Sequence, residues 1–204
     1  MKILNAVNDE LAPINIAIID LECTCEKDSS LTPSEIIEIG SVVGRLTSES
    51  LSITSELQIY VKPTINPTLT AFCTQLTGII QYTVDIADPL PEALPLLYDW
   101  LQSNNVAAWA SWGKFDATQL SRECELKSVP NPMAAIQHFN LKQLFARKFK
   151  QRVGLGRALE LRSLNFKGVP HSGIDDAKNI ANLISNETLL RDAILKRVTS
   201  PAST

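Results

Sequence analysis

One apolar stretch, Ile14-Asn15-Ile16-Ala17-Ile18-Ile19-Asp20-Leu21-Glu22, follows Pro13 and ends in two carboxylates. Its isoleucines predict a buried central strand. Successive side chains of a strand point to opposite faces, so Asp20 and Glu22 should project from the same face. Two carboxylates held beside apolar side chains repel each other unless a cation lies between them, and Mg2+ suits carboxylate oxygens. The simpler interpretation is a strand end that runs into a solvated acidic loop.

The remainder of the chain predicts a mixed α/β domain. Residues 35–43 and 51–61 indicate two further strands that continue an antiparallel meander, and residues 106–111 a short buried strand. Helical periodicity is found in residues 68–78, 89–102, 113–125, 141–149, 155–161 and 174–186. We therefore expect an α/β fold with a mixed sheet flanked by helices.

The length of the chain, 204 residues, is that of one ordinary domain. We expect a single domain over residues 1–204, with its core at about residues 14–186. Residues 1–12 should form a short, loosely held lead-in. Residues 187–204 should form a partly charged C-terminal tail that frays over residues 200–204.

The composition limits the class of protein. The net charge is −3, so no global basic field indicates nucleic-acid binding, although bound cations would change the balance at an acidic site. No apolar run approaches the roughly 20 residues of a membrane helix, and no secretory leader is recognisable, so we expect a soluble cytoplasmic protein without a membrane partner. The cysteines lack zinc spacing and should be reduced packing residues: Cys23, Cys25, Cys73 and Cys124.

Two later acids extend the opening pair. Asp116 follows a predicted strand in the first turn of a helix, and Asp176 lies near another helix start, after His171. Taken singly, each has a simpler role at a helix N-terminus, where Asp175 is an alternative cap. With the opening pair, however, the two acids could hold two cations that clamp a phosphodiester, one activating a water and the other stabilising the leaving oxygen. His171 could then take the proton from that water.

Three motifs occur in this order: Asp20-Leu21-Glu22-Cys23-Thr24, Trp112-Gly113-x-Phe115-Asp116 and His171-x4-Asp176. In order and spacing they resemble the motifs of the DEDDh family of 3′-to-5′ exonucleases. Further stretches look like the branch typified by the histone-mRNA 3′-end exonuclease: Glu35-Ile36-Ile37-Glu38-Ile39-Gly40, Phe72-Cys73-x-x-Leu76-Thr77-Gly78-Ile79, Asn140-Leu141-Lys142 and residues 171–181. The similarity covers about residues 14–186.

The resemblance implies a ribonuclease H-like fold and a metal-dependent 3′-5′ exonuclease. Such an enzyme releases nucleoside 5′-monophosphates from single-stranded nucleic acid, here RNA more than DNA, and no obligate protein partner is expected. The resemblance also implies two Mg2+ or Mn2+ ions and His171 as general base, and the His-x4-Asp spacing selects Asp176 over Asp175 as a ligand. The implied metal ligands are Asp20, Glu22, Asp116 and Asp176.

Substrate contacts are implied for Phe72, Phe115, Thr24 and Leu76. A base stacked on an aromatic ring gains roughly 1–3 kcal/mol. Phe72 belongs to an apolar helical stripe and is a core residue by that pattern alone. Phe115 adjoins Asp116 and is therefore the stronger stacking candidate.

A group of cations could guide the backbone of a nucleic acid, although charge runs on helices are usually only solvated faces. Its members are Lys114, Arg122, Lys142, Arg147, Lys148, Lys150 and Arg152. The segment Gly154-Leu155-Gly156-Arg157 does not follow a strand and lacks the ending of a phosphate loop, so its glycines should shape a helix junction.

Three hypotheses of function remain open from the sequence. The preferred one is the metal-dependent exonuclease. The second is a nucleic-acid-binding or polymerase-associated subunit with secondary hydrolysis, which Asp20→Ala would distinguish by its effects on turnover and binding. The third is a hydrolase of small nucleotides, which competition between a homopolymer and free nucleotides would distinguish.

Overall fold

The structure is a computed structural model of the chain, and it describes residues 11–28 and 30–199. The predicted lead-in falls mostly on residues 1–10, and the predicted fraying falls on residues 200–204. Both lie outside the described residues.

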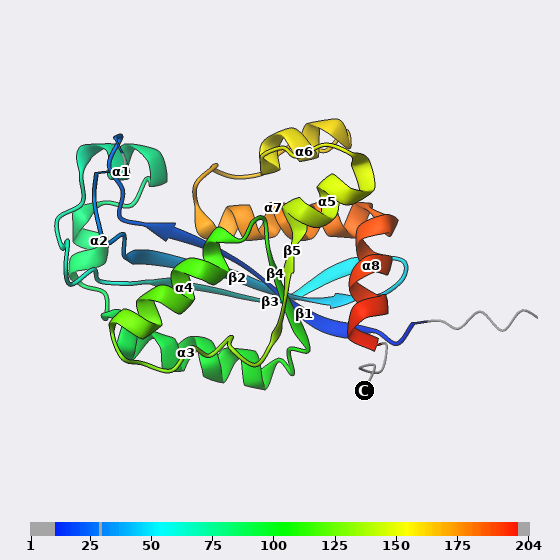
Figure 1. Cartoon of the computed structure of the whole chain (residues 1–204), viewed down its shortest axis with the longest axis horizontal. Coiled ribbons are helices and arrows are strands. Elements are labelled where there is room, and N and C mark those ends of the chain that lie inside the picture. Colours follow the sequence, from blue (N-terminus) through cyan, green and yellow to red (C-terminus); the bar gives the residue numbers. More distant parts are fainter. Residues whose placement is uncertain (1–10, 29, 200–204) are drawn as a thin grey trace, which may run out of the picture.

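A five-stranded mixed sheet with the order β3-β2-β1-β4-β5 forms the centre of the described part of the chain (Figure 1). The pairs β1–β2 and β2–β3 are antiparallel, whereas β1–β4 and β4–β5 are parallel. The predicted meander and the central place of the first strand are therefore confirmed. The strands are β1 (Ile14–Cys23), β2 (Ile36–Leu46), β3 (Leu51–Tyr60), β4 (Ala108–Ser111) and β5 (Gln137–Asn140).

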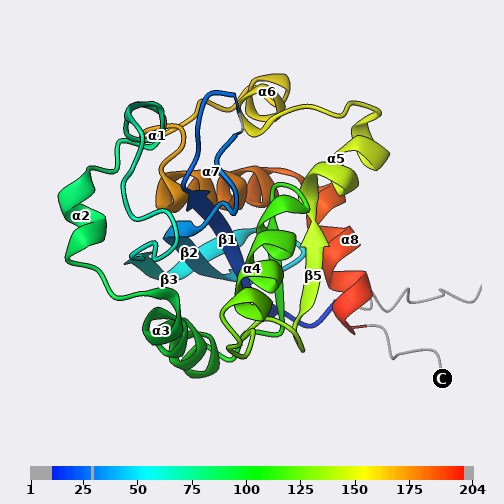
Figure 2. The same cartoon turned by 60° about the vertical axis from the view of Figure 1, so that its left-hand side comes forward.

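Helices cover both faces of the sheet. Helices α3 and α4 lie on one face and α5 to α8 on the other, while α1 and α2 lie beyond the carboxyl end of β1 (Figures 1 and 2). The bounds are α1 (Ala71–Thr77), α2 (Gln81–Asp85), α3 (Leu90–Ser103), α4 (Phe115–Leu126), α5 (Leu141–Phe149), α6 (Leu155–Leu161), α7 (Gly173–Asn186) and α8 (Thr188–Thr199).

Alternate residues of β1 enter two separate cores. Ile16 and Ile18 pack with residues of α5, α7 and α8, whereas Ala17 and Ile19 pack with α3 and α4. Because strand side chains alternate, Asp20 and Glu22 continue the row of Ile16 and Ile18. The two acids therefore lie on the face that α7 covers, as the alternation of the sequence predicts.

Helix α8 contradicts the predicted tail. Its apolar residues Leu190, Ile194 and Leu195 are fully buried in the α7-side core. Arg191 is also buried, and its guanidinium donates hydrogen bonds to the carbonyl oxygens of Ser48 and Ser185, 2.9 and 2.7 Å away. The sequence analysis expected a tail because this stretch is partly charged, but a buried charge such as that of Arg191 is tolerated where it is hydrogen-bonded.

The cysteines are free, and Cys23, Cys73 and Cys124 are buried, as predicted for reduced packing residues. In the described part of the chain, no helix is long and apolar enough to cross a membrane.

Candidate active site

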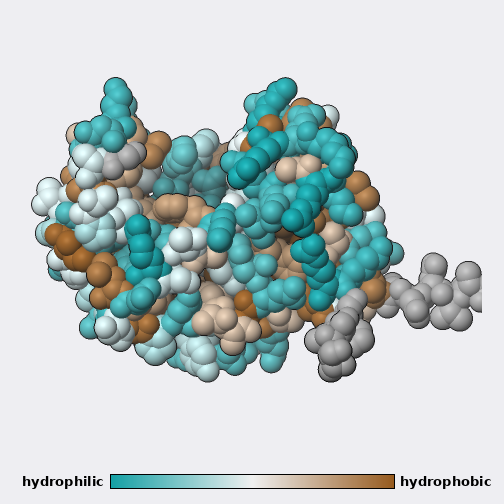
Figure 3. All heavy atoms as spheres, viewed as in Figure 1, coloured by the Kyte–Doolittle hydropathy of each residue, from teal (hydrophilic) through white to brown (hydrophobic). Residues whose placement is uncertain are grey.

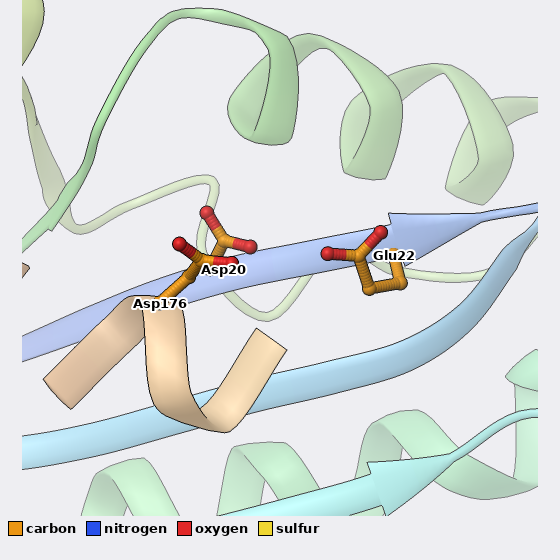
Figure 4. A group of neighbouring side chains, drawn as sticks. All are labelled: Asp20, Glu22 and Asp176. Atoms are coloured by element: carbon orange, nitrogen blue, oxygen red, sulfur yellow. The ribbon is translucent and has the colours of Figure 1, made fainter. Parts of the chain in front are cut away.

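Three carboxylates converge where β1 meets the start of α7. Oxygens of Asp20, Glu22 and Asp176 all lie within 4.8 Å of one another. Figure 4 shows Asp20 and Glu22 projecting from the strand toward the side chain that the helix contributes. The two acids that the sequence predicts to share a face of β1 thus meet Asp176, which is far away in the chain.

Two glycines allow α7 to approach the sheet so closely. Gly40 on β2 is the cross-strand partner of Asp20, and a Cβ added to Gly40 would lie 2.0 Å from the carbonyl carbon of Gly173. A Cβ on Gly173 would lie 3.0 Å from the backbone oxygen of Asp20. Backbone therefore packs against backbone here, and this contact brings Asp176, in the first turn of α7, to the end of β1.

Glu38 holds the start of α7 from the neighbouring strand. Its carboxylate accepts hydrogen bonds from the backbone N–H groups of Gly173 and Ile174, both at 3.2 Å, and from the side-chain amide of Gln58 at 2.9 Å. The side chain is buried, and Glu38 is the cross-strand partner of Glu22. It satisfies helix N–H groups that lack a partner within α7.

The sequence reasoning did not assign Glu38 to the site. A signal was present, because Glu38 and Gly40 share the alternation of Asp20 and Glu22 in an antiparallel pair.

Asp116 approaches the same place from the other side of β1. It lies in the first turn of α4, is buried, and its Oδ1 accepts a hydrogen bond from the backbone N–H of Leu21 at 3.2 Å. Asp116 lies outside the group of three, but among the charged neighbours of Asp20 it contributes most to raising the pKa of that residue. The structure therefore brings together all four acids that the motifs predict.

Burial and mutual repulsion both disfavour the charged form of the clustered carboxylates. Burial raises the pKa of Asp20 well above its ordinary value, and repulsion from Asp116 and Asp176 raises it further. Burial, followed by Asp176 and Glu38, raises the pKa of Glu22 to about 8, and burial raises that of Asp176 to about 6. A cation would relieve both repulsion and desolvation, and oxygen ligands of this kind fit Mg2+ or Mn2+.

The loop before α7 gives the neighbouring residues Asp175 and Asp176 different hydrogen-bond partners. Oδ2 of Asp175 accepts the N–H of Val169 at 2.9 Å, so this carboxylate holds the loop. Oδ2 of Asp176 accepts the N–H of His171 at 2.8 Å, and Asp176 belongs to the acidic cluster. His171 is exposed and adopts a left-handed backbone conformation with φ of 64°. The backbone of His171 is thus tied to Asp176, a member of the acidic cluster.

Comparison with known proteins identifies the family. The exonuclease family model RNase_T matches residues 17–184. The chain belongs to this exonuclease family. It is 34% identical over 178 residues to mouse "3'-5' exoribonuclease 1", covering 82% of this chain and 51% of that protein, and 35% identical over 193 residues to human "ERI1 exoribonuclease 3", covering 90% and 56%. The chain thus spans about half the length of the curated relatives it matches.

A solved structure confirms the fold of this exonuclease-family chain. The nuclease domain of 3′hExo, described as a DEDDh family member bound to rAMP, aligns with a TM-score of 0.78 and 32% identity, covering 85% of this chain and 91% of that one. The predicted DEDDh family and ribonuclease H-like fold are confirmed.

The residues that the family resemblance assigns to substrate differ in exposure. Phe115 begins α4 directly before Asp116 and is 57% exposed. Phe72 and Leu76 are half-buried on α1. Thr24 is buried, and its hydroxyl accepts the backbone N–H of Glu35 at 2.9 Å. The side chain of Thr24 is thus engaged within the fold, whereas the Phe115 ring is open to a ligand.

Proposed function

We propose that this exonuclease-family protein is a metal-dependent 3′-5′ exonuclease that hydrolyses single-stranded RNA to nucleoside 5′-monophosphates. The observation that carries the proposal is the convergence of Asp20, Glu22 and Asp176, with Asp116 beside them. Four buried or half-buried carboxylates in one place destabilise a fold unless they serve a cation. The exoribonuclease names of the relatives favour RNA over DNA.

The donor set fits two Mg2+ or Mn2+ ions, which Asp20, Glu22, Asp116 and Asp176 would hold. Bound there, such ions would lower the pKa of a water molecule and would neutralise charge on the attacked phosphate and the leaving oxygen. The protein keeps the ligands in position beforehand: Leu21 N–H orients Asp116, and His171 N–H orients Asp176. Glu38 fixes the helix start that carries Asp176.

His171 is proposed to take the proton from the attacking water. His171 is exposed, and an imidazole can act as a general base, so it can take a proton there and release it to solvent. The hydrogen bond from its own backbone to Asp176 keeps it next to the cluster.

The 3′ end is proposed to enter where the surface is hollowed between α1 and α6 (Figure 3). Phe115 offers a stacking surface for a base directly beside Asp116, and Phe72 and Leu76 on α1 are proposed as further contacts. Thr24 would contribute through the position of its backbone, because its hydroxyl is occupied.

An end-labelled ladder assay tests the proposal. RNA and DNA oligonucleotides labelled at the 5′ end are incubated with Mg2+, Mn2+ or EDTA. We expect stepwise shortening from the 3′ end, mononucleotide products, faster turnover of RNA, and complete loss of activity with EDTA. Asp20→Ala should abolish turnover while sparing binding. Internal cleavage, activity in EDTA, or activity on free nucleotides alone would refute the proposal.

A further inference from the structure

A cavity of about 950 Å³ lies between the start of α4, β5, α5 and α8. Its lining contains five cations and no acidic residue among the residues that the structure describes. The cations are Lys114, Lys142, Arg147, Arg152 and Arg197. We call this cavity the basic groove. Hydrophilic residues dominate the surface over α5 and α8 on this side of the molecule (Figure 3).

The cations of the basic groove differ from several others in the chain. Lys127, Arg157 and Lys178 each form an ion pair with a glutamate. By contrast, over residues 11–28 and 30–199 no hydrogen bond or ion pair joins the side chain of any of the five cations of the basic groove to another residue. Five positive charges without an acidic partner in the described residues repel each other across one concave surface. The chain as a whole is acidic, with a net charge of −3, so this local excess of positive charge is not a consequence of the composition. This arrangement fits an anionic ligand with several charges.

The position of the basic groove suggests which anion it takes. Gly113, Lys114 and Phe115 line it, and Asp116 follows immediately in the chain. The basic groove therefore opens at the ring proposed to stack a base and leads away from the acidic cluster. A strand whose 3′-terminal nucleotide lies at the cluster would place its preceding phosphates here.

We infer that the basic groove binds the phosphodiester backbone upstream of the 3′-terminal nucleotide and gives the enzyme its preference for polymers over short fragments. This inference rests on the proposed function, because it takes the acidic cluster as the end point of the strand. Phosphates attract arginine and lysine regardless of base, so the basic groove contributes affinity without sequence selection.

The structure also revises which cations guide the backbone. Arg122 donates hydrogen bonds to Gln119 and to the carbonyl oxygen of Ser34, away from the basic groove. Lys148 and Lys150 do not line it, whereas Arg197 on α8 does. Sequence spacing could not reveal Arg197, because α8 was not predicted.

Binding measured in EDTA tests the inference. Chelation prevents the proposed turnover, and the repulsion at the acidic cluster is then the same for every ligand. The probes are 5′-fluorescent RNA and DNA oligonucleotides of two, six and twelve nucleotides, titrated by anisotropy at several salt concentrations. The variant is Arg147→Gln/Arg152→Gln, whose two side chains are exposed and whose fold is checked by thermal melting. Arg45→Gln/Lys178→Gln is the control, because it removes the same charge near the β3 edge of the sheet, opposite β5.

We expect the affinity of the wild type to rise with length, in RNA and DNA alike. The Arg147→Gln/Arg152→Gln variant should lose on the order of tenfold on twelve nucleotides, and its salt slope should fall by roughly 0.7 per lost phosphate contact. The dinucleotide and the control variant should show little change, and Arg197→Gln alone should show a smaller loss on long ligands. Equal losses at all lengths, or an unchanged affinity for twelve nucleotides, would overturn the inference.

The ladder assay keeps the two proposals distinct. A protein that binds long strands through the basic groove but yields no ladder in Mg2+ refutes the proposed function and leaves the binding site in place. If the protein yields the ladder but the affinity of Arg147→Gln/Arg152→Gln depends on ligand length as in the wild type, only the inference about the basic groove is refuted.

Discussion

Replacing Glu22 with Gln should stabilise the metal-free protein at pH 8, although it removes a proposed metal ligand. Burial, followed by the charges of Asp176 and Glu38, raises the pKa of Glu22 from 4.5 to about 8. The folded protein therefore holds this proton more tightly than the unfolded chain does. The contribution of Glu22 to the free energy of unfolding consequently decreases as the pH rises from about 4.5 to about 8, and it stays unfavourable above that range.

The magnitude follows from this pKa difference. It corresponds to roughly 5 kcal/mol at most, since one pKa unit is worth about 1.36 kcal/mol. The realised effect is smaller because Asp20 and Asp176 titrate together with Glu22 and redistribute protons among them. We expect the Glu22→Gln variant to gain about 1–3 kcal/mol at pH 8, which raises the melting temperature of a domain of this size by about 2–12 °C. At pH 5 the gain should fall below about 1 kcal/mol.

Differential scanning calorimetry in EDTA at pH 5 and pH 8 measures this effect. The control is Glu125→Gln, which neutralises an exposed acid on α4 and should leave the melting temperature almost unchanged at both pH values. Adding Mg2+ at pH 8 should then stabilise the wild type more than the Glu22→Gln variant. If the variant melts at or below the wild-type temperature at pH 8 in EDTA, or if its gain does not depend on pH, the electrostatic reasoning is wrong.

Three further predictions concern the supports of the site. Gly40→Ala should lower the free energy of unfolding by at least about 3 kcal/mol, because the new methyl group would overlap the backbone of Gly173. The control is Gly156→Ala in α6, where a Cβ meets nothing within 4 Å; it should be neutral or stabilise the protein by up to about 1 kcal/mol. Equal effects of the two substitutions in urea unfolding would contradict the close approach of α7 to the sheet. Glu38→Ala should lower the free energy of unfolding, measured with urea in Mg2+, by about 2–4 kcal/mol because it leaves two N–H groups of α7 unpaired. The control Glu49→Ala, at an exposed turn, should leave the free energy of unfolding almost unchanged. His171→Ala should lower turnover by about 10²–10⁴-fold with nearly unchanged Mn2+ affinity in calorimetric titration, and a large loss of affinity would show that this residue supports the metal ligands instead.

Much of the fold follows from patterns within the sequence. The isoleucine run of β1 and the stripe of α7 are long and periodic, so their type and place were predicted well. β5 was missed because Gln137–Asn140 has four residues of which only Phe139 is buried, too few to show alternation. α8 was missed because Arg191, a charged residue, is buried through hydrogen bonds to distant carbonyl groups.

The candidate site shows a similar division. The motifs predicted which four acids would meet, and alternation along β1 predicted that Asp20 and Glu22 share a face. Alternation signals that Glu38 and Gly40 share a face, but the contact of Gly40 with Gly173, which brings the start of α7 to Glu38, arises only from the packed structure. The basic groove likewise combines residues of α4, α5 and α8 that are far apart in the sequence.

Anomalous diffraction from crystals grown with Mn2+ tests the central claim most directly, because it locates the ion without relying on activity. The strongest anomalous peak should lie among the carboxylate oxygens of Asp20, Glu22 and Asp176, and a crystal of Asp176→Asn prepared in the same way should lose most of it. Manganese bound only elsewhere on the molecule, or an equally strong peak in the variant, would contradict the account.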